Sequence, residues 1–81
     1  MEIKVLGTGC AKCEQLYETT RAAVEQSGLD PGLVVKVADI DEILAHGVMM
    51  TPALVIDGEV KSTGKVPDAA QIAAWVGEAA G

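Results

Sequence analysis

Hydrophobic residues recur along the chain with two different periods, which predict helices and strands in alternation. Between Cys10 and about Ser27 they recur every three or four positions, as they do on an amphipathic helix. The residues on this stripe are Cys13, Leu16, Tyr17, Thr20, Ala23, Val24 and Ser27. Gly28 follows the stripe and can end the helix in a left-handed conformation.

Two further helices are predicted downstream. Asp39 is a plausible N-cap for a short helix that stops at Gly47. This helix carries Ile40, Ile43 and Leu44. The last helix begins near Pro67, a residue favoured at helix starts, and Trp75 lies beside its apolar stripe. That stripe comprises Ala69, Ile72, Ala73, Val76 and Ala79.

Four short segments have strand character. Glu2–Gly7 alternates apolar and polar residues. Leu33–Ala38 is rich in β-branched residues, so we expect much of both its faces to be buried. Ala53–Ile56 and Glu59–Ser62 flank Asp57-Gly58, and two strands around Asp-Gly are a strong hairpin signal.

The order of these elements is strand, helix, strand, helix, strand, strand, helix, which predicts an α/β fold with a four-stranded mixed sheet flanked by three helices. The right-handed crossover rule makes the strands at 2–7 and 33–38 parallel. If the strand at 53–56 pairs antiparallel to the first strand, Pro52 lies near Cys10 in space. That last step assumes the order of the strands in the sheet.

Composition narrows the class of protein. The chain has 81 residues, so we expect a single domain over residues 1–81. The formal net charge is −6, Lys and Arg do not cluster, and Tyr17 and Trp75 are the only aromatic residues, which argues against nucleic-acid binding. No apolar run is long enough to cross a membrane, and residues 1–6 lack the apolar stretch of a signal peptide. We therefore expect a cytoplasmic protein.

The two cysteines carry the candidate chemistry. Cys10 and Cys13 lie at the predicted boundary between the first strand and the first helix. Unpaired N–H groups and the helix dipole stabilise an anion there, so the pKa of a thiol at this position falls. Lys12 adds a nearby positive charge. We expect Cys10 to be the exposed nucleophile and Cys13, a turn inward on the apolar stripe, to be the resolving thiol.

The predicted reaction is thiol–disulfide exchange. Cys10 attacks a substrate disulfide, and Cys13 then displaces the reduced substrate to leave a Cys10–Cys13 disulfide. The cycle requires no metal and no organic cofactor, but it needs an external electron donor.

Four other roles for the pair fit the sequence less well. A permanent structural disulfide would close a very short loop, which gains little entropy, in a compartment expected to be reducing. A buried, inert pair conflicts with the position of Cys10 directly after Gly7-Thr8-Gly9. A zinc site needs four ligands, and His46 is the only soft or borderline residue that could join as a third. A carrier of a soft metal such as Cu(I) stays as the alternative function, because two thiolates suit that ion. Small copper carriers, however, end in a strand where this chain ends in a predicted helix.

The chain resembles the thioredoxin-like superfamily, most closely its small, glutaredoxin-sized branch of redox-active disulfide proteins. The segments that carry the resemblance are Gly7–Cys13, Thr51–Gly58 and Gly64–Pro67, and together they span nearly the whole chain. The resemblance implies a thioredoxin-like fold. It also implies a disulfide reductase as electron donor, disulfide-containing proteins as substrates, and a monomer.

The same resemblance implies roles for residues around the pair. Thr51-Pro52 is expected to be a cis peptide bond that faces the cysteines, with the backbone before Pro52 pairing with the substrate. Ala11 and Lys12 are expected to tune activity or contact substrate. Thioredoxin itself has Gly-Pro at these two positions and buries an acid on an early strand. Here neither Val5–Leu6 nor Leu54–Ile56 contains an Asp or Glu.

Overall fold

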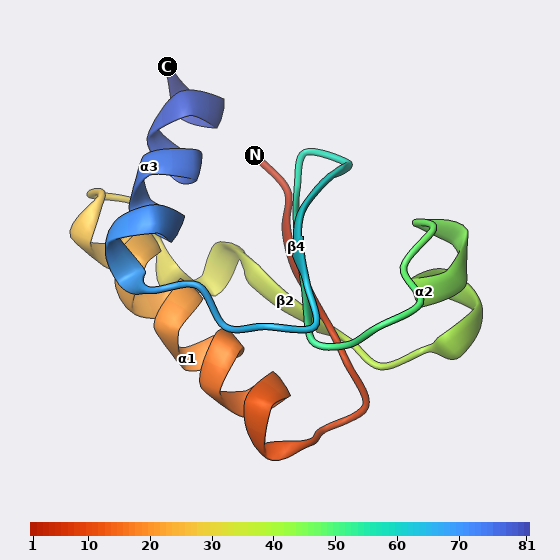
Figure 1. Ribbon diagram of the computed structural model, residues 1–81. Coiled ribbons are helices and arrows are strands. Elements are labelled where there is room, and N and C mark those ends of the chain that lie inside the picture. The colour runs from red at the N-terminus through yellow and green to blue at the C-terminus, as the bar shows by residue number, and fades with distance from the viewer.

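A four-stranded mixed sheet forms the centre of the molecule in a computed structural model that describes residues 1–81 (Figure 1). The strands are β1 (Ile3–Leu6), β2 (Val34–Val37), β3 (Ala53–Ile56) and β4 (Glu59–Thr63). Their order in the sheet is β2-β1-β3-β4, with β1 parallel to β2 and antiparallel to β3. The predicted thioredoxin-like α/β fold, element order and parallel pair are confirmed.

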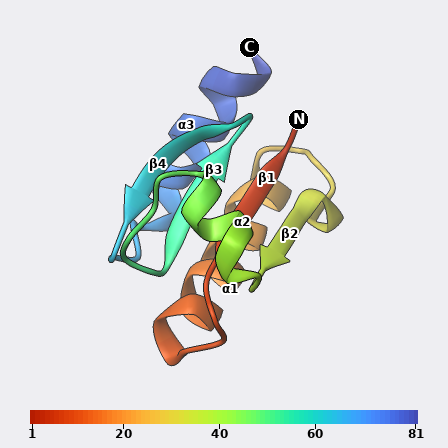
Figure 2. The ribbon, with the colours of Figure 1, turned by 90° about the vertical axis from the view of Figure 1, so that its right-hand side faces the viewer.

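Helices cover both faces of this sheet. Helices α1 (Ala11–Gln26) and α3 (Ala69–Ala80) pack together on one face, and the short α2 (Ile40–Ala45) lies on the other (Figures 1 and 2). The main core lies between the sheet and the two long helices. Its buried members are Ile3, Val5, Leu16, Ala23, Val24, Val34, Leu54, Ile56, Ile72 and Val76. Trp75 packs against this cluster, as expected.

A smaller cluster forms under α2. Its buried members are Leu6, Val37, Ile43, Val48, Ala53 and Val55. Because side chains alternate along a strand, β1, β2 and β3 each contribute residues to both clusters. None of the helices is long and apolar enough to span a membrane.

Local chemistry explains where the helices start. The Asp39 carboxylate accepts hydrogen bonds from the N–H groups of Asp41 and Glu42, so the predicted N-cap is confirmed. In the same way Asp68, one residue after Pro67, caps α3 by accepting from the N–H of Gln71 at 2.8 Å. Such caps satisfy N–H groups that have no partner within the helix.

The predicted hairpin joins β3 to β4. Asp57 and Gly58 both have positive φ, at 50° and 81°, as a two-residue turn of this hand requires. Asp57 also ties the turn to the N-terminal strand, since its carboxylate accepts from the N–H of Glu2 at 2.7 Å.

One burial prediction was wrong. We expected β2 to be largely buried on both faces, but Val35 is 51% exposed and Lys36 is also exposed. The physical reason is the position of β2 at the edge of the sheet, where α2 does not cover it. Helix α2 itself buries only Ile43 and leaves Ile40 and Leu44 open to solvent.

Candidate active site

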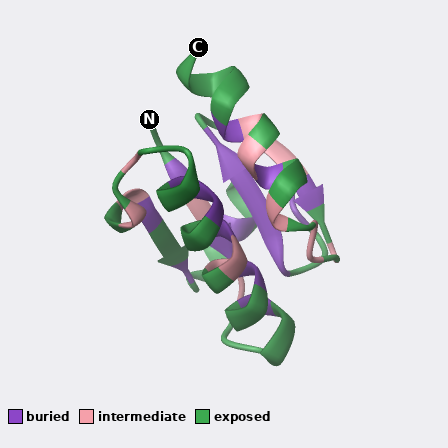
Figure 3. Ribbon diagram, turned by 90° about the vertical axis from the view of Figure 1, so that its left-hand side faces the viewer, coloured by how far each residue is buried: buried purple, intermediate pink, exposed green.

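Cys10 is the N-cap of α1. Its backbone is extended, with φ −71° and ψ 166°, and its Sγ accepts a hydrogen bond from the N–H of Cys13 at 3.3 Å. Sulfur thus takes the place that a carboxylate oxygen takes at the starts of α2 and α3. The residues from Thr8 to Lys12, which form the loop before α1 and the first two residues of the helix, are all exposed, Cys10 among them. Figure 3 shows the start of α1 exposed at the lower end of the molecule.

Hydrogen bonds lower the pKa of the Cys10 thiol from its ordinary value. The largest contribution comes from the side chain of Cys13, followed by the backbone N–H of Cys13. Partial desolvation opposes these effects, and the N–H groups of Lys12 and Cys10 add to them. Lys12 therefore contributes to the lowered pKa of Cys10 through its backbone N–H.

Cys13 is the inner member of the pair. It is 5% exposed and lies on the buried side of α1, one turn before Leu16. Both cysteines are free thiols. The sequence therefore placed one thiol at the surface and one beneath it correctly.

The start of β3 closes the site from the other side. Leu6 pairs with Ala53, so the end of β1 lies beside the segment that precedes β3, as we had assumed. The Thr51-Pro52 bond is cis, as the resemblance implied. Thr51 is exposed, whereas Pro52 is buried. Gly7 lies between Thr51 and Cys13. A Cβ placed on Gly7 would lie 4.0 Å from the Thr51 Cβ and would overlap the sulfur of Cys13.

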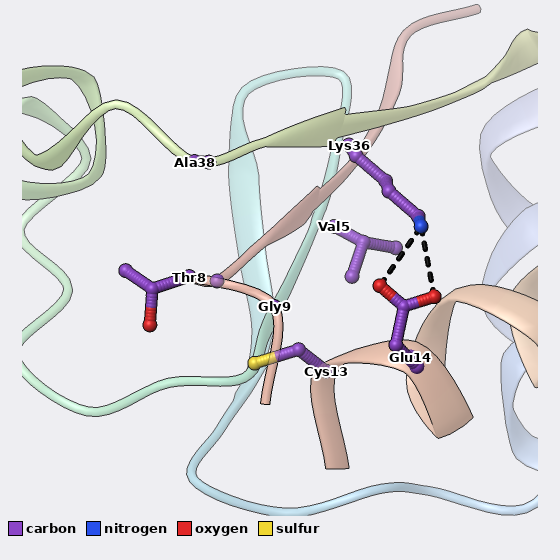
Figure 4. Close-up of a pocket in the computed structure, with 8 residues that line it drawn as sticks. Val5, Thr8, Gly9, Cys13, Glu14, Lys36 and Ala38 are labelled. Atoms are coloured by element: carbon purple, nitrogen blue, oxygen red, sulfur yellow. Dashed lines mark hydrogen bonds and ion pairs between the residues drawn. The ribbon is translucent and has the colours of Figure 1, made fainter. Parts of the chain in front are cut away.

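Two charged residues that the sequence analysis missed line a cavity together with Cys13. The cavity has a volume of about 140 Å³, and Glu14 and Lys36 form part of its wall with Val5 and Gly7. Figure 4 shows how these side chains lie. The Lys36 ammonium donates to both Glu14 carboxylate oxygens, at 2.9 and 2.8 Å. This bond to Glu14 is the main cause that raises the pKa of Lys36. The early strands hold no acid, as expected, but the helix supplies one next to the pair.

The remaining candidate residues occupy the rim. Ala11 and Lys12 are both exposed between the cysteines. His46, the third ligand considered for a metal, ends α2. No group of three or more His, Cys, Asp or Glu side chains is arranged to hold a metal ion.

Taken with the fold, the dithiol at the start of α1 and the cis-proline segment beside it define a thiol–disulfide oxidoreductase of the thioredoxin type. Comparison with known proteins gives the same class. The thioredoxin domain family matches residues 1–77, and the chain belongs to this family.

Two archaeal relatives, both named thioredoxin, are similar over most of their length. The protein of Methanocaldococcus jannaschii is 43% identical over 70 residues, which cover 86% of this chain and 79% of the relative. The protein of Methanothermobacter thermautotrophicus is 39% identical over 72 residues, which cover 89% of this chain and 92% of the relative. These comparisons favour the oxidoreductase over the soft-metal carrier considered above.

Proposed function

We propose that Cys10 is the attacking nucleophile of this oxidoreductase and that Cys13 resolves the mixed disulfide. One observation carries the assignment: the exposed sulfur is the helix cap whose pKa is lowered, and the other sulfur is buried behind it. A thiolate is the attacking species in disulfide exchange, so the thiol with the lowered pKa and open access reacts first.

The electrons and the leaving groups balance over two steps. In the first, the Cys10 thiolate attacks one sulfur of the substrate disulfide, and the other substrate sulfur leaves as a thiolate. In the second, the Cys13 thiolate attacks the Cys10 sulfur, and the second substrate sulfur leaves. The substrate gains two electrons, and the Cys10–Cys13 disulfide that forms has lost them.

Cys13 must lose its proton before the second step. We propose the Glu14 carboxylate as the acceptor by way of water in the cavity that it lines together with Cys13, since its side chain points to Lys36 and not directly to the Cys13 sulfur (Figure 4). Lys36 holds this carboxylate in place with its two hydrogen bonds. The acceptor thus comes from the residue after Cys13 on α1.

The geometry of the rim supports a proposal for the substrate, and the family supports one for the electron donor. We propose that an extended, disulfide-containing protein segment lies along exposed Thr51 beside Pro52, with Ala11 and Lys12 contacting it from the helix side. A disulfide reductase returns the two electrons. The protein acts as a monomer in the cytoplasm, where such a reductase keeps the pair reduced.

Trapping experiments test the two cysteine roles. With an insulin-like disulfide substrate, wild-type protein is expected to turn over when a chemical reductant regenerates it. Cys13→Ser should accumulate a stable mixed disulfide with substrate, and Cys10→Ser should form none. A mixed disulfide that forms through Cys13 in the Cys10→Ser protein would reverse the assignment.

A further inference from the structure

Gly7 lies so close to Cys13 that a residue with a side chain at position 7 would overlap it. A Cβ placed on Gly7 would overlap the Cys13 Sγ and would lie 2.9 Å from the Cys13 Cβ. Atoms of this size do not approach so closely without a shift of one partner. The sulfur of Cys13 therefore rests against the backbone of residue 7, in the space that a side chain would fill.

Position 7 requires glycine because of the limited space around it and not because of its backbone conformation. Most other loop glycines of the chain have positive φ and open surroundings, so their backbone conformation explains them; they are Gly9, Gly28, Gly47 and Gly58. Gly7 is not among the residues with positive φ. An alanine could adopt its backbone conformation, and only the contact with Cys13 opposes it.

The backbone of both residues is held in place, so only the Cys13 side chain is free to move away from a new Cβ at residue 7. The Gly7 N–H donates to the carbonyl oxygen of Val37 at 2.9 Å, which ties the end of β1 to β2. Cys13 is held by its own N–H, which donates to the Cys10 sulfur at 3.3 Å. Leu16, one turn later, is fully buried in the main core and anchors the helix.

We propose that Gly7 is a positioning residue for the resolving thiol, an inference that rests on the proposed roles of Cys10 and Cys13. Because residue 7 has no side chain, the Cys13 sulfur can keep one position behind Cys10, in contact with the backbone of residue 7. A methyl group at residue 7 would meet Thr51 only at ordinary contact distance, 4.0 Å between Cβ atoms, but it would displace the sulfur. Space for the displaced sulfur exists in the adjoining cavity, so the expected result is a misplaced nucleophile in a folded protein.

A two-phase assay separates the two thiols in the test. When reduced protein reacts with a limiting amount of 5,5′-dithiobis(2-nitrobenzoate), attack by Cys10 releases one coloured thiolate and leaves a mixed disulfide. Attack by Cys13 on the Cys10 sulfur then releases the second coloured thiolate and forms the internal disulfide. Stopped-flow absorbance at a limiting ratio of reagent to protein gives both rates, and Cys13→Ser protein should show the first phase alone.

Gly7→Ala is expected to leave the first rate, divided by the fraction of Cys10 that is thiolate at the assay pH, within about twofold of wild type. The correction is needed because the displaced Cys13 side chain also contributes to the lowered pKa of Cys10, and the pH dependence of the first phase supplies it. The second rate should fall by about tenfold or more, because displacement of a reacting atom by an ångström costs up to about a hundredfold. Gly77→Ala is the matched control, since a Cβ there meets nothing within 4 Å, and both rates should equal those of wild type.

Several outcomes would overturn the proposal. It fails if folded Gly7→Ala protein resolves at the wild-type rate, or if the first rate, corrected for the thiolate fraction of Cys10, falls together with the second. A second phase that persists in Cys13→Ser protein would instead refute the cysteine roles themselves.

If Gly7→Ala does not fold, the same substitution in a Cys13→Gly background decides, because that background removes both Cys13 side-chain atoms that the new methyl group would meet. Recovery of folding there, relative to the Cys13→Gly protein alone, supports the contact with the Cys13 side chain, and failure to recover overturns it.

Discussion

Replacing Leu16 with alanine should cost a large part of the stability of this protein. Leu16 follows the cysteine pair on α1, is 0% exposed, and belongs to the core cluster that joins β1, β2, β3 and both long helices. Leu-to-Ala changes at such sites cost about 3–5 kcal/mol, from lost burial and the cavity left behind. A domain of 81 residues has a total stability of about 4–12 kcal/mol, so the loss is a substantial fraction.

Thermal and urea denaturation, followed by circular dichroism, measure this loss. Because 1 kcal/mol corresponds to about 4–8 °C in a domain of this size, Leu16→Ala should lower Tm by at least about 12 °C. Leu44→Ala is the matched control, since Leu44 is 56% exposed on α2 and should change stability by about 0.5 kcal/mol or less. The reasoning is refuted if Leu16→Ala loses under about 1 kcal/mol, or if the two variants lose the same amount.

Three further predictions concern the site and its supports. Cys13→Ala should raise the pKa of Cys10, because it removes the side chain that contributes most to lowering that pKa. The rate of Cys10 alkylation should then reach its plateau at a higher pH than in wild type, and an unchanged pH profile would contradict this. Glu14→Gln should slow the second, Cys13-dependent phase of disulfide exchange at neutral pH and leave the first phase unchanged, whereas Lys36→Met should slow it less; equal effects on both phases would exclude Glu14 as the acceptor. Asp39→Ala should destabilise the protein by about 0.5–2 kcal/mol in urea denaturation, because α2 loses its N-cap, and Asp39→Asn should restore most of this loss.

Local interactions explain why so much of the fold could be predicted. Helix α1 is amphipathic over its whole length, and the Asp-Gly turn requires positive φ at both of its residues. Both features depend on residues close together in the chain, so both can be recognised in the sequence. The exposed and buried cysteines follow from the same logic, because a helix cap faces out and a residue three positions later can face in. The cis Thr51-Pro52 bond came from the family resemblance, since the residues alone do not distinguish it.

What could not be predicted depends on contacts between distant segments. Lys36 reaches Glu14 only because β2 pairs in parallel with β1, in the register that sets Lys36 opposite Val5. The exposure of Val35 depends on β2 lying at the edge of the sheet, and a strand sequence does not reveal its neighbours. A close approach such as that of Gly7 to Cys13 leaves no signal except the glycine itself.

The choice of sulfur as a helix cap couples the stability of α1 to the redox state of the pair. Where the other two helices begin with an aspartate, α1 begins with a group that can be an anion only when it is reduced. The N–H of Cys13 and the helix dipole stabilise the Cys10 thiolate, and oxidation removes that negative charge. This stabilisation favours the dithiol form, so it raises the reduction potential above that of an unperturbed pair. The same hydrogen bond that makes Cys10 reactive therefore also limits how strong a reductant the protein is.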